Sequence, residues 1–185
     1  MSIDENLDEE LRIFKKVSGL SENDENTLRE AVSVILPHIG PLTETFYEQL
    51  TAEPKTAEYI EGRVDLLKKT HTQWIEALFS GNYDEAFIES QLRIGRTHVS
   101  AKIPPLFVAS SMSYLRSAFP KLINQEFSND EKKAGDISSS VLRVLDLCQY
   151  LIDYAYEQDR LKRLTDATGL TRPLLENLIA LKAKG

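Results

Sequence analysis

The sequence predicts an all-α protein, and three observations support this. The 185 residues include only eight glycines and seven prolines, which punctuate the chain at intervals. Between them, apolar residues recur every three or four positions, the spacing that places them on one face of a helix. No convincing stretch alternates apolar and polar residues between turn residues, as a half-buried strand does. A chain of this length forms one ordinary domain with a hydrophobic core.

Capping residues and helix breakers delimit the first two helices. The first spans about residues 4–18 and ends at Gly19, a residue suited to a helix C-cap. Ser21 is a suitable N-cap for the second helix, and acidic residues follow it in the first turn. Because proline cannot continue a helix without losing a hydrogen bond, we expect this helix to stop before Pro37.

Prolines and polar turns mark the next four helices. Proline costs nothing at a helix start, so Pro41 and Pro54 open the third and fourth helices. The fourth is expected to run without interruption to about Leu78, and Asp84 caps a fifth helix that ends near residue 102. The sixth begins at the Pro104–Pro105 pair.

A long seventh helix covers about residues 131–164, which corresponds to roughly 50 Å. Its middle is apolar nearly all round: Val141, Leu142, Val144, Leu145, Leu147, Cys148, Leu151 and Ile152. A helix of this kind is buried on more than one side. One side would face its own core and the other a partner chain, so we expect a homodimer in which helices six and seven form a four-helix bundle. The alternative is the central helix of a monomer.

Composition excludes several classes of partner. The chain carries 22 basic and 29 acidic residues, a net charge of -7, which disfavours nucleic acid and anionic membranes as partners. A single cysteine allows no internal disulfide. No signal peptide and no apolar run near the ~20 residues of a membrane span are present. We expect a cytoplasmic protein.

Three histidines are the candidate metal ligands. His38, between Pro37 and Gly40, is expected at the surface in a turn. His71 and His98 lie on apolar-rich helices, where a histidine is more often a core residue than a ligand. Gly95, one turn before His98, would let a flat group approach, and nearby basic side chains would suit its carboxylates. Haem iron needs such an imidazole on a rigid helix beside an apolar slot.

The sequence supports other kinds of active site less well than a haem site. No HExxH motif, P-loop or GxGxxG motif is present, and no nucleophile elbow is visible. We therefore expect no enzymatic activity.

Several motifs together resemble the globin-coupled sensors, bacterial relatives of protoglobins. Residues 74–84 read WIEALFSGNYD, residues 94–98 read IGRTH and residues 103–105 read IPP, which is similar to that family's FSGxYD, IGRxH and proline turn. Residues 46–50, FYEQL, are similar to its FYxxL helix. The resemblance extends from about Ser21 to Tyr156, and the short first helix corresponds to the family's extra N-terminal helix. It implies a globin-like fold that binds haem b.

The resemblance also implies roles for individual residues. His98 matches the proximal haem ligand, and Tyr47 matches the distal tyrosine that, in many members, donates a hydrogen bond to bound oxygen. Leu67 is near a distal position that screens the ligand. His71 and Trp74 share a helical face that lines the haem pocket, although ordinary core packing is an equal alternative for both. A further alternative for His71 is a second iron ligand in a ferric form.

The expected function is a sensor of oxygen or another diatomic gas, which signals through its C-terminal helix to an output domain or partner. The alternatives are a globin-fold signalling module that has lost haem and, third, a haem enzyme acting on nitric oxide or peroxide. We place the sensor globin domain at residues 1–156 and a helical linker or C-terminal extension at residues 157–185. Within the extension, residues 164–172 faintly resemble the opening of a diguanylate cyclase domain, the alternative being a short capping helix after a turn.

Overall fold

The computed structural model describes residues 5–182, and over those residues all of its regular secondary structure is helical. The helices are α1 (Glu5–Ser18), α2 (Glu22–Ala52), α3 (Pro54–Ile60), α4 (Val64–Leu78), α5 (Glu85–Ser100), α6 (Pro105–Glu126), α7 (Glu131–Thr168) and α8 (Arg172–Lys182). The all-α prediction is confirmed, and α1 is the expected extra N-terminal helix. None of these helices is long and apolar enough to cross a membrane, as far as the described residues show.

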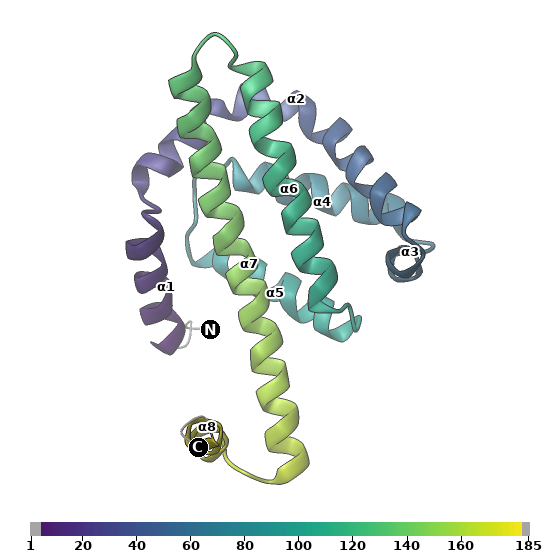
Figure 1. Ribbon diagram of the computed structural model, residues 1–185, viewed down its shortest axis with the longest axis vertical. Coiled ribbons are helices and arrows are strands. Elements are labelled where there is room, and N and C mark those ends of the chain that lie inside the picture. Colours follow the sequence, from purple (N-terminus) through teal and green to yellow (C-terminus); the bar gives the residue numbers. More distant parts are fainter. Residues whose placement is uncertain (1–4, 183–185) are drawn as a thin grey trace.

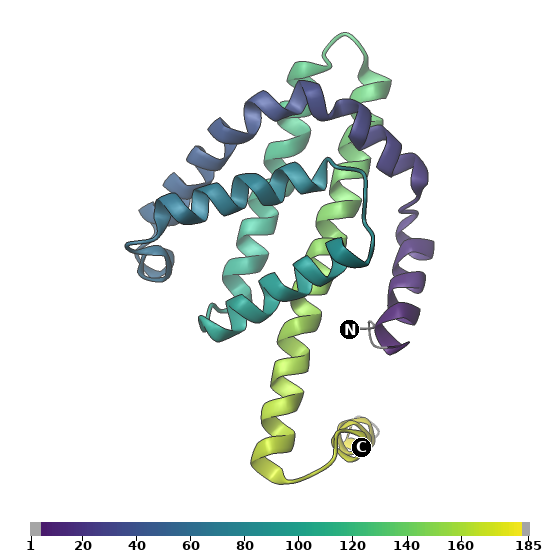
Figure 2. The same cartoon turned by 180° about the vertical axis from the view of Figure 1, so that it is seen from behind.

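The long helix α7 is the centre of the molecule. It packs mainly against α5, α6 and α2, and α6 runs antiparallel beside it (Figure 1). Seen from behind, α4 and α5 lie in front of the α6–α7 pair, one above the other (Figure 2). The lower part of α7 extends beyond these neighbours toward α8 (Figure 1).

The apolar middle of α7 is covered within one chain. Val141, Val144, Leu145, Leu147, Cys148 and Leu151 are all 0% exposed in the single protomer. Leucines of α1 belong to the same core cluster, and Phe14 of α1 stacks on Tyr150 of α7 with ring centroids 5.8 Å apart. A partner chain is needed only where a side of α7 stays uncovered, and within the protomer α1 lies against α7 alongside α5, α6 and α2. These buried residues therefore fit the alternative, a central helix of the protomer, and the homodimer stays a prediction.

Two expected helix boundaries were wrong, because α2 continues through Pro37 and Pro41. Both prolines are exposed and, four residues apart, share one face of the helix. Their missing N–H groups therefore fall on the solvent side, and the hydroxyl of Thr45 donates a 3.1 Å hydrogen bond to the carbonyl oxygen of Pro41. The helix bends midway instead of ending (Figure 2). His38 accordingly lies inside α2 and not in a turn, half-buried, with Nε2 3.3 Å from Glu126.

The segment that begins at Pro54 is two helices and not one. α3 ends at Ile60, and Gly62 adopts φ +70° before α4 begins at Val64. This conformation is accessible to glycine at little cost, so the chain turns there. The seventh helix also runs slightly further than expected, to Thr168, where Gly169 with φ +70° caps it. A turn and α8 follow, as in the simpler interpretation of the extension.

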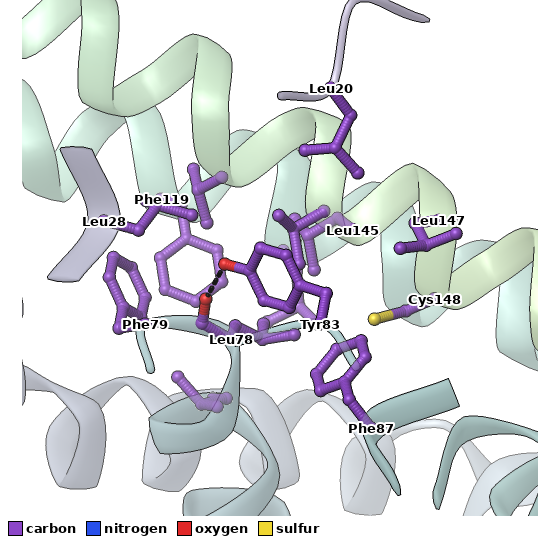
Figure 3. Close-up of a cluster of buried hydrophobic side chains, with 14 of the residues drawn as sticks. Leu20, Leu28, Leu78, Phe79, Tyr83, Phe87, Phe119, Leu145, Leu147 and Cys148 are labelled. Carbon is purple, nitrogen blue, oxygen red and sulfur yellow. Dashed lines mark hydrogen bonds between the residues drawn. The ribbon is translucent and has the colours of Figure 1, made fainter. Parts of the chain in front are cut away.

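The connection between α4 and α5 is anchored in the core. Tyr83 is 4% exposed, and its hydroxyl donates a 2.5 Å hydrogen bond to the carbonyl oxygen of Leu78 (Figure 3). Its ring contacts Phe87 edge-on at 4.9 Å, while Phe79 packs on Phe119 of α6 at 5.6 Å. Leu145 and Cys148 of α7 complete this cluster (Figure 3). The turn between α4 and α5 is thus fixed to α6 and α7.

Candidate functional site

His98 lies in the last turn of α5, a helix with well-defined ends. The side chain of Asp84 accepts a 3.0 Å hydrogen bond from the backbone N–H of Phe87 at its start. At its end, Lys102 adopts φ +55°, and the backbone N–H of Ile103 donates a 3.0 Å bond to the carbonyl oxygen of His98. This is the usual left-handed termination of a helix, with a lysine where glycine is common.

The imidazole of His98 is oriented by the backbone of its own helix. Its Nδ1 atom is 2.7 Å from the carbonyl oxygen of Ile94. A carbonyl oxygen only accepts, so Nδ1 is the donor, and in the neutral imidazole Nε2 keeps its lone pair. Metal-bound histidines commonly have this arrangement, in which one ring nitrogen donates to a carbonyl and the other faces the metal. The half-buried His98 side chain therefore fits the role of an iron ligand.

An aromatic cluster brings together α2, α4 and α6. His71 stacks between Phe46 and Trp74, with ring centroids 4.7 Å and 5.5 Å away. Tyr47 meets His71 edge-on at 5.7 Å, and Tyr114 of α6 lies 5.5 Å from Phe46. The structure thus brings the rings of Tyr47 and Trp74 against His71, and a haem pocket lined by these three residues stays a prediction.

Tyr47 has a buried ring and an available hydroxyl group. The residue is 7% exposed, and burial raises its pKa to about 12, so it is protonated at neutral pH. No hydrogen bond to this hydroxyl is found within residues 5–182, yet the oxygen is not fully enclosed. Tyr47 can therefore donate a hydrogen bond to a small ligand beside it.

His71 is held in its neutral form. Burial lowers the pKa of its imidazole from 6.5 to about 4. Its Nδ1 lies 3.4 Å from the hydroxyl oxygen of Thr43, a buried polar residue of α2. This environment suits both a pocket wall and a core residue, and a neutral imidazole also keeps a lone pair for a metal.

Leu67 and Trp74 lie on the same face of α4. Leu67 packs against the cluster of Phe46, Tyr47 and Ile60. Trp74 donates a 2.8 Å hydrogen bond from Nε1 to Oε1 of Gln91 on α5. The face of α4 that carries Leu67, His71 and Trp74 is therefore directed at the aromatic cluster and at α5.

Gly95 lies against α7. A Cβ on this residue would be 2.6 Å from the Cβ of Ala155 and 3.0 Å from the carbonyl oxygen of Ile152. The missing side chain is thus required by the packing of α5 on α7. The basic residues near His98, Arg93, Arg96 and Lys102, are all exposed, and Arg96 pairs with Glu89.

Sequence reasoning did not single out two buried polar residues beside the site, Thr43 and Gln91. They are 2% and 1% exposed. Both residues have apolar neighbours at helical spacing in the sequence. This spacing is the one sequence signal that they face inward.

Comparison with known proteins agrees with this architecture. The Protoglobin family model matches residues 7–162. The globin domain of a Geobacter sulfurreducens globin-coupled sensor superposes with a TM-score of 0.73 at 24% identity, covering 78% of this chain and 96% of that one. The ferric globin domain of E. coli DosC superposes with a TM-score of 0.67 at 19% identity, covering 77% and 99%. The fold is that of the globin domains of globin-coupled sensors, and the chain belongs to the protoglobin family.

Proposed function

We propose that this protein is a sensor globin that binds haem b through His98 and responds to oxygen or another diatomic gas. The observation that carries the proposal is the 2.7 Å contact between Nδ1 of His98 and the carbonyl oxygen of Ile94. It leaves Nε2 as a ligand atom on a helix that is capped at both ends. Membership of the protoglobin family supports the same cofactor.

The chain's own residues would have different roles around the haem. Ferrous haem supplies an iron coordination position that takes a diatomic gas. Nε2 of His98 would hold the iron, and the hydroxyl of Tyr47 would donate a hydrogen bond to the gas on the distal side. Leu67 and Trp74 would exclude water as apolar walls, and neutral His71 would avoid placing a charge there.

The exposed ends of the site suit the haem carboxylates. Arg93 on α5 and Lys102 just after it are both exposed. Ammonium and guanidinium groups bind carboxylates by charge-assisted hydrogen bonds.

The test is the absorption spectrum of the purified protein after haem reconstitution. We expect a Soret band at one haem per chain that shifts on reduction with dithionite and again with carbon monoxide. His98→Ala should abolish stoichiometric uptake, whereas His38→Ala, the matched control on α2, should retain it. A His98→Ala variant with normal haem content would contradict the proposal, and a wild-type protein without a Soret band would favour the haem-free signalling module.

The signal would leave the globin domain through α7. α7 passes uninterrupted from the core into the extension, so a shift at α5 would reach the C-terminal end of α7 through shared packing. The homodimer through α6 and α7 is part of this proposal, and sedimentation of the haem-loaded protein checks it. Sedimentation as a monomer at micromolar concentration would remove the bundle from the mechanism.

A further inference from the structure

Within residues 5–182, one side-chain hydrogen bond joins the two helices that flank the candidate site. The indole N–H of Trp74 on α4 donates 2.8 Å to Oε1 of Gln91 on α5. Gln91 is 1% exposed and is one of few polar residues in the described core. A buried amide is tolerated there because its polar atoms have partners.

The pairing also fixes the orientation of the Gln91 amide. An indole N–H only donates, so the amide oxygen faces Trp74 and the NH₂ group faces away. That NH₂ group donates 2.9 Å to the hydroxyl of Ser90, which donates 2.7 Å to the carbonyl oxygen of Phe87. At the other end, the Trp74 ring stacks on His71. The bond therefore connects the backbone of α5 to the distal aromatic cluster.

Helix geometry places this bond beside the site. Residues seven apart lie on the same face of a helix, about 10 Å apart along its axis. Gln91 precedes His98 by seven residues on α5, and Trp74 follows Leu67 by seven on α4. The bond thus crosses from α4 to α5 on the side near their connection, about 10 Å from the level of His98 and Leu67.

We infer that Gln91 is a positioning residue whose bond to Trp74 sets the separation of α4 and α5 and so holds His98 ready for haem. α4 packs mainly on α2 and α5 mainly on α7, and direct backbone contacts between α4 and α5 are few, so this bond is a direct tie between the two helices away from their connection. The inference rests on the proposed function, because the separation matters to haem only if His98 binds it.

The first test needs no haem. Gln91→Leu removes the acceptor, and Gln91→Glu keeps an oxygen at the same place. We expect amide hydrogen exchange in residues 64–78 and 85–100 of the haem-free protein to quicken in Gln91→Leu and to stay near the wild-type rate in Gln91→Glu. Trp74 is the only tryptophan, so its emission spectrum reports on the same bond and should shift in Gln91→Leu alone.

The second test is the rate of haem loss to excess apomyoglobin. Gln91→Leu should accelerate the loss about fivefold, the effect expected for one hydrogen bond. In a Trp74→Phe background the same substitution should change the rate by less than about twofold, because the bond is already absent. Ile137→Val shortens a fully buried side chain near the start of α7 that has no part in the bond between Trp74 and Gln91, and it should leave haem loss unchanged.

Unchanged exchange in both helices, or unchanged haem loss from Gln91→Leu, would overturn the inference while leaving His98 as the ligand. Failure of the wild-type protein to take up haem would instead overturn the proposed function. The exchange experiment would then still decide whether Gln91 positions α5.

Discussion

Gly95 of α5 and Ala155 of α7 approach so closely that a Cβ on Gly95 would stand 2.6 Å from the Cβ of Ala155. Gly95→Ala should therefore push α5 away from α7. We expect it to lower the free energy of unfolding by about 1–3 kcal/mol, as overpacking commonly does. Chemical denaturation of the haem-free protein measures this.

The matched control shortens the opposing residue. Ala155→Gly removes the nearest atom, so Gly95→Ala should cost less in that background than in the wild type. Equal stability of Gly95→Ala and wild-type protein would show that the helices can part freely. Gly95 would then remain available for the role predicted from the sequence, the approach of a flat group.

Tyr47→Phe should speed oxygen release several-fold. One hydrogen bond is worth about 1 kcal/mol, or somewhat more when the acceptor is partly charged. Because the Tyr47 hydroxyl has no hydrogen-bond partner within residues 5–182, the unfolding free energy of the haem-free variant should hardly change. Stopped-flow measurement of the off-rate decides, and an unchanged rate would remove Tyr47 from the gas site.

His71 should make the stability of the haem-free protein depend on pH. Burial lowers its pKa to about 4 in the folded chain, so the unfolded chain, with a pKa near 6.5, takes up the proton first as pH falls. The folded state therefore loses stability between pH 6.5 and about 4, by at most about 3 kcal/mol. Comparing urea denaturation of wild-type protein and His71→Phe across this window isolates the contribution.

The same variant tests the remaining role of His71. If His71 coordinates ferric iron, the ferric wild-type protein should have a six-coordinate low-spin spectrum. His71→Phe should then lose that spectrum. An identical ferric spectrum would leave His71 as a wall or core residue.

Lys102→Gly should stabilise the protein. A left-handed conformation costs a non-glycine residue roughly 1–2 kcal/mol, and glycine is common at this helix end. Glycine also loses more backbone entropy on folding, which offsets part of this gain. We therefore expect the unfolding free energy to rise by about 0.5–1 kcal/mol. Thermal unfolding checks it, and a lower melting temperature would mean that the exposed lysine side chain has a stabilising role of its own.

The sequence predicted the helical class because apolar spacing within each helix is a local signal. Helix boundaries at Pro37 and Pro41 were wrong for a reason that is not local. Proline ends a helix only if its missing hydrogen bond is costly, and here both residues face solvent on the outside of a bend. Gly62 shows the opposite case, since an uninterrupted apolar pattern from residue 60 to 78 concealed the turn between α3 and α4.

For a similar reason, the sequence predicted some residues of the candidate site but not the contacts that others make. The sequence singled out Tyr47, His71 and Trp74, and these three come together in space. The surroundings of Gly95 and the pairing of Gln91 depend on residues 60 and 17 positions away, respectively. No periodicity within one helix contains such contacts. The cover of the apolar middle of α7 is likewise not local, because it comes from α2, α5 and α6 and from leucines of α1, and the homodimer stays a prediction.

The length of α7 gives the molecule a mechanical lever. Leu145 is fully enclosed by the core, and the end of the helix at Thr168 lies about 35 Å further along its axis. A tilt of the enclosed part by about 5° would displace that end by about 3 Å. A rearrangement too small to disturb the core can thus become a displacement that another protein surface is able to detect.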